Sequence, residues 1–171
     1  ENAVEAALQL KEADSSRNVI VLSVGPSRAT EAVRKALSLG ADEGILVTDD
    51  ALAGSDVLGT AWTLSNALNQ IDDIELIIAG NASTDGGAGS IPGLLSEYRQ
   101  IPALTHMQTL NVEGGKVTGE RVTDEGKFGL EAPLPAIVSV TEKANTPRFA
   151  AFKGIMAAKK KKIQELTLAD I

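Results

Sequence analysis

Short apolar runs alternate with amphipathic segments over the first hundred residues of this chain. Residues 18–24, 44–48 and 74–80 are runs of this kind, and each predicts a buried strand. The segments around them carry apolar residues at helical spacing. Strands and helices that alternate in this way form parallel sheets with right-handed crossovers. The pattern therefore predicts an α/β fold with a mostly parallel, twisted sheet and helices on both faces.

Four helices are expected in this part of the chain. The first carries an apolar stripe from Ala3 to Leu10, the second follows Ser27 and stops at Gly40, and the fourth runs from about Pro92 to Arg99. The third is capped by Ser55 or Asp56, and its apolar stripe is expected to face inward: Leu58, Ala61, Trp62 and Leu68.

The pattern changes after residue 100. Residues 105–113 and 116–124 alternate around Gly114-Gly115, which predicts a β-hairpin inserted into the α/β fold. A further extended stretch covers 128–132, and the lone His106 is expected to be structural. Arg121, Asp124 and Glu125 near the hairpin end are surface charges or contacts to another subunit.

The last part of the chain is expected to begin with a buried strand at 133–140. An irregular loop from 142 to 151, a basic helix at about 154–163 and a tail follow it. We find no linker that would divide the sequence, so residues 1–171 are predicted to form a single domain.

Charge is distributed unevenly. The chain has 16 Lys and Arg against 23 Asp and Glu, yet seven of the bases and none of the acids lie in residues 143–162. The acidic remainder does not suit nucleic acid, whose phosphates need a basic face. The chain has no Cys and one His, so disulfides and thiolate catalysis are excluded and no metal site is expected. We expect no membrane insertion, because the apolar runs are too short.

A glycine-rich loop follows the third expected strand and opens the fourth helix. It reads Gly80-Asn-Ala-Ser-Thr-Asp-Gly-Gly-Ala-Gly-Ser90. Glycines let a ligand approach the backbone, and a helix N-terminus presents free N–H groups, so this position suits a phosphate. A flexible connection with Ser90 as an ordinary helix cap explains the same residues. Two roles are open for Asp85: accepting a hydrogen bond from a sugar hydroxyl, or ordering the loop.

Residues 145–156 combine apolar and basic side chains in a segment whose Pro and Gly indicate a loop. Phe149, Phe152, Ile155 and Met156 lie among Arg148 and Lys153. Exposed apolar side chains with a charged rim are typical of protein docking. The alternative is that the two Phe side chains pin the loop to the core. Lys159 to Lys162 form either a patch for an anionic partner or the solvated end of a helix.

These segments, in this order, resemble the β subunit of electron transfer flavoproteins. The resemblance covers nearly the whole chain and rests most on three parts: residues 19–26 with the following 36–42, residues 124–140, and Asn145-x-Pro-Arg-Phe149 through Lys153-Gly-Ile-Met-Ala-Ala-Lys-Lys-Lys-Lys162. It implies a fold of the adenine-nucleotide-binding (HUP-like) type. It also implies AMP in this subunit, or a second FAD in bifurcating members, and FAD in a partner α subunit. The family's N-terminal strand and C-terminal extension are expected to be missing from residues 1–171.

The resemblance also assigns site residues. It places the recognition loop for partner dehydrogenases at 148–157, with seven contact residues: Arg148, Phe149, Phe152, Lys153, Gly154, Ile155 and Met156. It places the nucleotide on the end of one strand and on the glycine-rich loop: Val24, Gly80, Asn81, Ala82, Ser83, Thr84, Asp85, Gly86, Gly87, Ala88, Gly89, Ser90 and Ile91.

The leading hypothesis is thus a non-catalytic β subunit in a heterodimer that carries electrons, as in fatty acid β-oxidation. Its partners would be the α subunit, acyl-CoA dehydrogenase-like donors and an acceptor of the quinone oxidoreductase type. The location would be cytoplasmic in bacteria and the mitochondrial matrix in eukaryotes. The alternatives are a stand-alone nucleotide-binding protein and a nucleotide-transferring or nucleotide-hydrolysing enzyme of the same broad fold.

Overall fold

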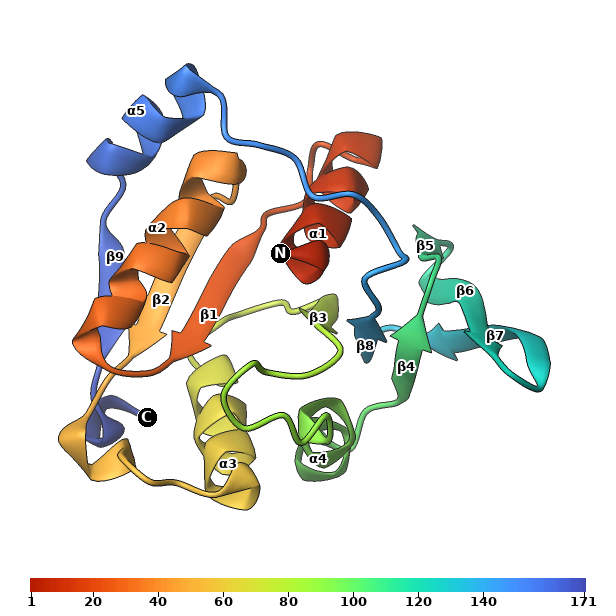
Figure 1. Ribbon diagram of the computed structural model, residues 1–171, viewed down its shortest axis with the longest axis horizontal. Coiled ribbons are helices and arrows are strands. Elements are labelled where there is room, and N and C mark those ends of the chain that lie inside the picture. Colours follow the sequence, from red (N-terminus) through yellow and green to blue (C-terminus); the bar gives the residue numbers. More distant parts are fainter. The chain divides into compact units, whose positions relative to one another are not determined.

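The chain forms two compact units, each assembled from segments that are distant in sequence. The computed structural model describes all residues from Glu1 to Ile171. One unit comprises Glu1–Leu10 and Ile71–Pro147, and the other comprises Lys11–Gln70 and Arg148–Ile171. Each unit combines helices with its own sheet (Figure 1), so the predicted α/β class is confirmed. The single domain over residues 1–171 stays a prediction.

The unit formed by Lys11–Gln70 and Arg148–Ile171 has a three-stranded parallel sheet. Its strands are β1 (Ile20–Val24), β2 (Glu43–Val47) and β9 (Ile163–Leu166), in the order β1–β2–β9. Because β2 lies between two strands, its residues after Glu43 are all buried, as the continuous apolar run predicts. Strand β9 corrects the sequence prediction, which gave these residues to a helix end and a tail.

Three α-helices belong to this unit: α2 (Thr30–Leu39), α3 (Val57–Leu68) and α5 (Phe152–Lys160). Short 3₁₀ turns cover Ser27–Ala29, Asp50–Leu52 and Leu168–Asp170. Gly40 ends α2 at a φ of 126°, which confirms its predicted role, and Asp56 caps α3 by accepting from the Gly59 N–H. Ser27 lies in a 3₁₀ turn and does not cap α2.

The unit formed by Glu1–Leu10 and Ile71–Pro147 has a six-stranded mixed sheet. Strands β3 (Leu76–Ala79), β8 (Ala136–Val140) and β4 (Ala103–Met107) are parallel and lie in that order. Three antiparallel strands continue the sheet: β6 (Lys116–Thr123), β5 (Asn111–Glu113) and β7 (Gly126–Pro133). Helix α4 (Ile91–Arg99) connects β3 to β4, and most of α1 (Asn2–Ala13) belongs to this unit.

The predicted hairpin is confirmed. Gly114 and Gly115 join β5 to β6 at φ values of 62° and 76°, the positive values that a type I′ turn requires at both central positions. Two boundaries were wrong. The first arm, predicted as one strand over 105–113, is divided between β4, which ends at Met107, and β5, which begins at Asn111. Pro133 ends β7, and the last buried strand begins only at Ala136. All five residues of β8 are buried between β3 and β4, where a β-branched run is expected.

The prediction that Leu58 and Trp62 face inward was wrong. Their exposed fractions are 52% and 57%. Helix α3 instead buries a face of mostly small side chains, which includes Ala61, Ser65 and Leu68. Small side chains let a helix approach its neighbours closely, so here they outweigh the larger apolar residues in deciding which face is covered.

Gly119 in the hairpin lies so close to neighbouring backbone that there is no room for a side chain. A Cβ on Gly119 would lie 2.0 Å from the Thr109 carbonyl oxygen and 2.9 Å from Met107 Cε. Backbone at 2.0 Å cannot yield cheaply, so Gly119→Ala should lower the free energy of unfolding by about 3 kcal/mol in urea titrations. The paired strand offers a control, since a methyl group on Gly129 meets nothing within 4 Å. An equal loss in Gly129→Ala would contradict this explanation.

Candidate functional site

The glycine-rich loop leaves the carboxyl end of β3 and leads into α4. Nearly all of residues 80–90 are exposed. Gly87 and Gly89 have φ values of 63° and 65°, in the left-handed region that favours glycine. The path of the loop is therefore set by backbone conformations that other residues adopt only with strain.

Asp85 orders this loop. Its Oδ1 accepts from the Gly86 N–H at 2.7 Å, and the Ser83 hydroxyl oxygen accepts from the Gly87 N–H at 3.3 Å. The bond from the Gly86 N–H, with further bonds from the Ser83 hydroxyl and the Asp85 N–H, lowers the pKa of the Asp85 carboxyl. Of the two roles considered for Asp85, the loop-ordering contacts are the ones present.

The N-terminus of α4 is open toward the loop. Ser90 occupies the N-cap position, but its side chain caps no backbone N–H, and Pro92 lies in the first turn. The first N–H groups of a helix have no partner within it and carry a partial positive charge. The backbone of Gly89, Ser90 and Ile91 therefore fits an anion such as phosphate.

The nucleotide residues predicted from sequence are divided between the two units. Gly80 to Ile91 lie together in the unit that contains β3, and Val24 ends β1 in the other. Val24 is half-buried, and the Gly25 N–H that follows it donates to the Val47 carbonyl at 3.0 Å.

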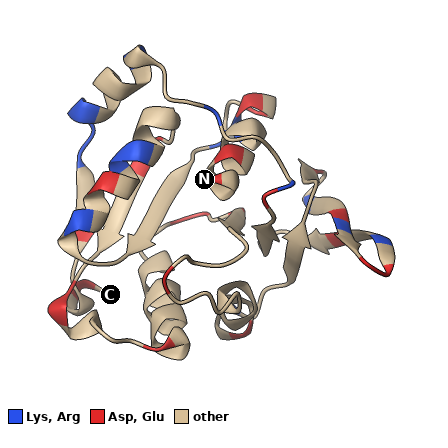
Figure 2. Ribbon diagram, in the orientation of Figure 1, with Lys and Arg blue, Asp and Glu red and all other residues tan.

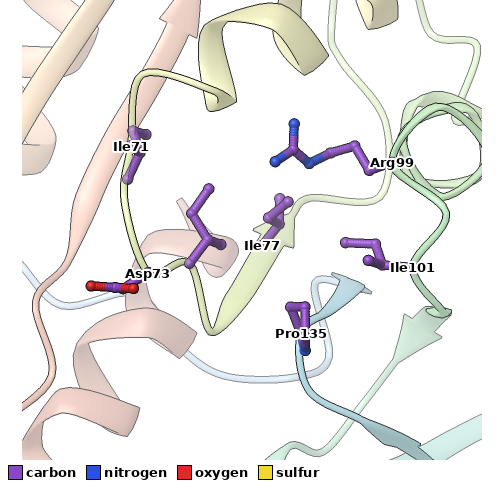
Figure 3. A pocket seen from close by; sticks show the side chains of 7 residues that line it. Ile71, Asp73, Ile77, Arg99, Ile101 and Pro135 are labelled. Atoms are coloured by element: carbon purple, nitrogen blue, oxygen red, sulfur yellow. The ribbon is translucent and has the colours of Figure 1, made fainter.

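A pocket of about 240 Å³ lies at the opposite end of β3 from the glycine-rich loop. Its lining is mainly apolar, with Asp73 pointing away from Arg99 (Figure 3). Five apolar residues line it: Ile71, Ile74, Ile77, Ile101 and Pro135. Ligands of open α/β sheets bind at the carboxyl ends of the strands, whereas this pocket lies beside the start of β3. It is therefore a poor candidate for the nucleotide site.

Helix α5 carries its large apolar residues on the side away from the protein. The face that contacts α2 holds Gly154 and Ala158, and Ala158 is 1% exposed. On the opposite side, Phe152 is 77% exposed, and Ile155 and Met156 are each 41% exposed. The helix predicted at about 154–163 is present, but it begins at Phe152 and ends at Lys160, so most of the recognition segment 148–157 is helical.

Phe149, just before α5, is 97% exposed. The alternative that Phe149 and Phe152 pin this segment to the core is therefore wrong. Together with Ile155 and Met156, they form an exposed surface that we call the docking surface. None of the five aromatic residues of the chain belongs to its buried core. Exposed aromatic and Met side chains are typical of protein interfaces.

Figure 2 shows where the Lys and Arg residues lie along the ribbon. The bases of residues 143–162 have two kinds of position. Arg148 forms an ion pair with Glu12 of α1, and Lys161 Nζ donates to the Ala41 carbonyl at 2.7 Å. Lys153, Lys159, Lys160 and Lys162 are exposed. Part of this basic segment therefore fastens α5 to the protein, and part lies on the surface around it.

Asp42, just before β2, connects α1 to the residue that precedes β1. It forms an ion pair with Lys11 at 2.5 Å and accepts from the Val19 N–H at 2.8 Å. Partial burial acts to raise the pKa of its carboxyl, but the hydrogen bonds from Lys11 and Val19 and the positive charges of Lys11 and Lys161 outweigh it. The pKa is therefore lowered.

His106 lies in β4, as the sequence suggested. It is exposed at a φ of 58°, within an irregularity of β4 between Leu104 and Met107. Its backbone N–H donates to the Ser139 hydroxyl at 2.8 Å. Nearby, the Arg121 Nε–H donates to the Thr105 carbonyl at 2.8 Å, which ties the hairpin to β4.

No group of three or more His, Asp and Glu side chains lies close enough together to hold a metal ion. No helix has the length and apolar character needed to cross a membrane.

The structure is that of an α/β protein in which a glycine-rich loop connects a parallel strand to a helix. The family model that describes the electron transfer flavoprotein domain matches residues 1–171. The chain therefore belongs to the electron transfer flavoprotein domain family, as the sequence motifs predicted.

The similar proteins are β subunits. Electron transfer flavoprotein subunit beta from Mycobacterium leprae is 58% identical over 175 residues, which cover 100% of this chain and 66% of the relative. The subunit from Mycobacterium tuberculosis is 56% identical with the same coverage. The one from Megasphaera elsdenii is 34% identical over 177 residues, again covering 100% and 66%. The chain thus spans slightly less than two thirds of the length of these relatives.

Asp42→Asn tests the ion pair between Asp42 and Lys11, because the stability that this pair contributes depends on pH. The pKa of Asp42 is lowered from 3.8 in the folded state, so the carboxylate stabilises the fold above that pH. This stabilisation is lost as the pH falls through the folded pKa. We expect the variant to unfold at lower urea than the wild type at about pH 7, with the difference between the two midpoints shrinking as the pH is lowered below 3.8. A difference that stays constant over this range would contradict the assignment.

Proposed function

We propose that this chain is the part of an electron transfer flavoprotein β subunit that holds AMP and docks partner dehydrogenases. The observation that carries the docking role is the exposed apolar side of α5, with Phe152, Ile155 and Met156 directed away from the protein. A helix that covered only its own core would bury these residues and expose the small ones. Their exposure beside surface lysines is better explained by a protein partner.

The nucleotide role rests on the loop from Gly80 to Ile91. Two left-handed glycines and an uncapped helix N-terminus provide backbone N–H groups for a phosphate, and Asp85 holds the loop in shape. These residues fit the phosphate of AMP, or that of a second FAD. We propose this loop as a binding element and assign no catalytic side chain to it.

We further propose that the full protein pairs with an α subunit, as the word subunit in the names of the relatives suggests. FAD held by that partner would supply the redox chemistry. The residues of this chain would support the heterodimer, bind the nucleotide, and bring a dehydrogenase of the acyl-CoA type, or an acceptor of the quinone oxidoreductase type, to a fixed position.

The nucleotide role predicts that full-length β subunit, purified with its α subunit, releases AMP or FAD when denatured. Mass spectrometry of the released small molecules checks this, and finding neither would contradict the nucleotide role.

Gly89→Ala should weaken AMP binding by about tenfold, because a side chain at its φ of 65° strains the loop. Gly114→Ala is the control, since it places an alanine at a φ of 62° in a hairpin turn outside the loop. An equal loss of AMP in both variants would point to general destabilisation.

The docking role predicts that Phe152→Ala slows electron delivery from a partner dehydrogenase. Removal of an exposed interface aromatic should raise KM for the heterodimer by about tenfold. The melting temperature should stay close to that of the wild type, because the side chain is 77% exposed. Steady-state reduction of the heterodimer by the dehydrogenase gives KM. Phe128→Ala, which removes an exposed aromatic side chain of β7 outside the docking surface, is the control. An unchanged KM for Phe152→Ala would show that docking occurs elsewhere.

A further inference from the structure

Helix α5 is held at both ends by α2, and Figure 1 shows the two helices side by side in their unit. We propose that Arg34 of α2 is a positioning residue for the docking surface: it fixes the direction in which α5 presents Phe152, Ile155 and Met156. This inference rests on the docking role proposed above. Arg34 lies outside the recognition segment and does not belong to the docking surface.

Arg34 holds the C-terminal end of α5. Its Nη1 donates to the Ala158 carbonyl at 2.7 Å and to the Lys161 carbonyl at 2.5 Å. The last carbonyls of a helix carry a partial negative charge, so a guanidinium there complements the helix dipole. The Ala158 carbonyl also accepts from the Lys161 N–H at 3.1 Å, and Arg34 adds a second bond to it. One side chain thus fixes where α5 stops and where the chain turns into β9.

Gly154 holds the first turn of α5. A Cβ on Gly154 would lie 2.4 Å from the Ser38 carbonyl oxygen, so the α5 backbone is packed directly against the end of α2. Residue 158 follows one turn later on the same face and is also small. This contact limits how far α5 can rotate, because successive residues of a helix are about 100° apart.

The two contacts act together on the docking surface. The packing at Gly154 provides a fixed point near the start of α5, and the bonds from Arg34 prevent the other end from tilting. Lys161 adds a separate attachment through the Ala41 carbonyl. Without Arg34, α5 would keep its first contact and its helical character, but its apolar side would take a range of directions. A partner would then bind only the fraction of molecules in which α5 has the right direction, and this lowers the apparent affinity.

The test uses the full-length heterodimer and a partner dehydrogenase. Arg34→Gln removes the cation, and Arg34→Lys keeps a cation that can donate to both carbonyls. Lys35→Gln is the matched control, because it removes one positive charge from an exposed position of the same helix. We expect Arg34→Gln to raise KM for the heterodimer about fivefold with little change in kcat. Arg34→Lys should recover at least half of this loss, and Lys35→Gln should behave as the wild type.

Two further measurements separate positioning from general damage. Amide hydrogen exchange in residues 152–161 should be faster in Arg34→Gln, and chemical reduction of the flavin by dithionite should be unchanged. If Phe152→Ala raises KM and Arg34→Gln does not, the positioning role of Arg34 is wrong while the docking surface stands. If neither variant changes KM, the docking role itself is wrong. If Arg34→Gln does not fold, Arg34→Met, which keeps the unbranched aliphatic stem but cannot donate to the two carbonyls, carries the test. A KM equal to that of the wild type in Arg34→Met, with unchanged exchange in α5, overturns the positioning role.

Discussion

The contact between the Gly154 backbone and the Ser38 carbonyl determines which face of α5 is buried. Only a residue without a side chain fits there, since a Cβ would lie 2.4 Å from the carbonyl oxygen. With Gly154 and Ala158 directed inward, the geometry of an α-helix places Phe152, Ile155 and Met156 outward. The exposed apolar surface is therefore a direct consequence of close packing between two helices.

The glycine-rich loop follows a similar principle in the other unit. Left-handed φ values at Gly87 and Gly89, together with the bond from the Gly86 N–H to Asp85, fix the path of the backbone. Recognition of a phosphate would then depend on N–H groups at the start of α4 and not on a long side chain. In both regions small residues fix the backbone conformation. In the loop, the backbone would present its own N–H groups to a ligand; in α5, it determines which side chains would face a partner.

The sequence was informative where one local rule determined the structure. The β-branched runs gave β1, β2, β3 and β8, and Gly114-Gly115 gave the hairpin, because burial and positive φ leave clear local patterns. It misled at Trp62, where the small residues of α3 took the buried side. It also missed β9, whose four residues become a strand only because β2 has an open edge for them. Arg34 gave no signal, since its acceptors lie more than a hundred residues away in the chain.

The charge pattern gains a more specific meaning from these contacts. Residues 143–162 hold seven bases and no acid, yet Arg148 and Lys161 are engaged with Glu12 and the Ala41 carbonyl. The exposed lysines that remain surround the docking surface. Surface charges screened by salt contribute mainly to the rate of encounter, whereas desolvated apolar contacts determine how long a complex lasts. Under the proposed docking role, the lysines would attract an acidic partner, Phe152 and its neighbours would hold it, and Arg34 would set the direction in which it is held.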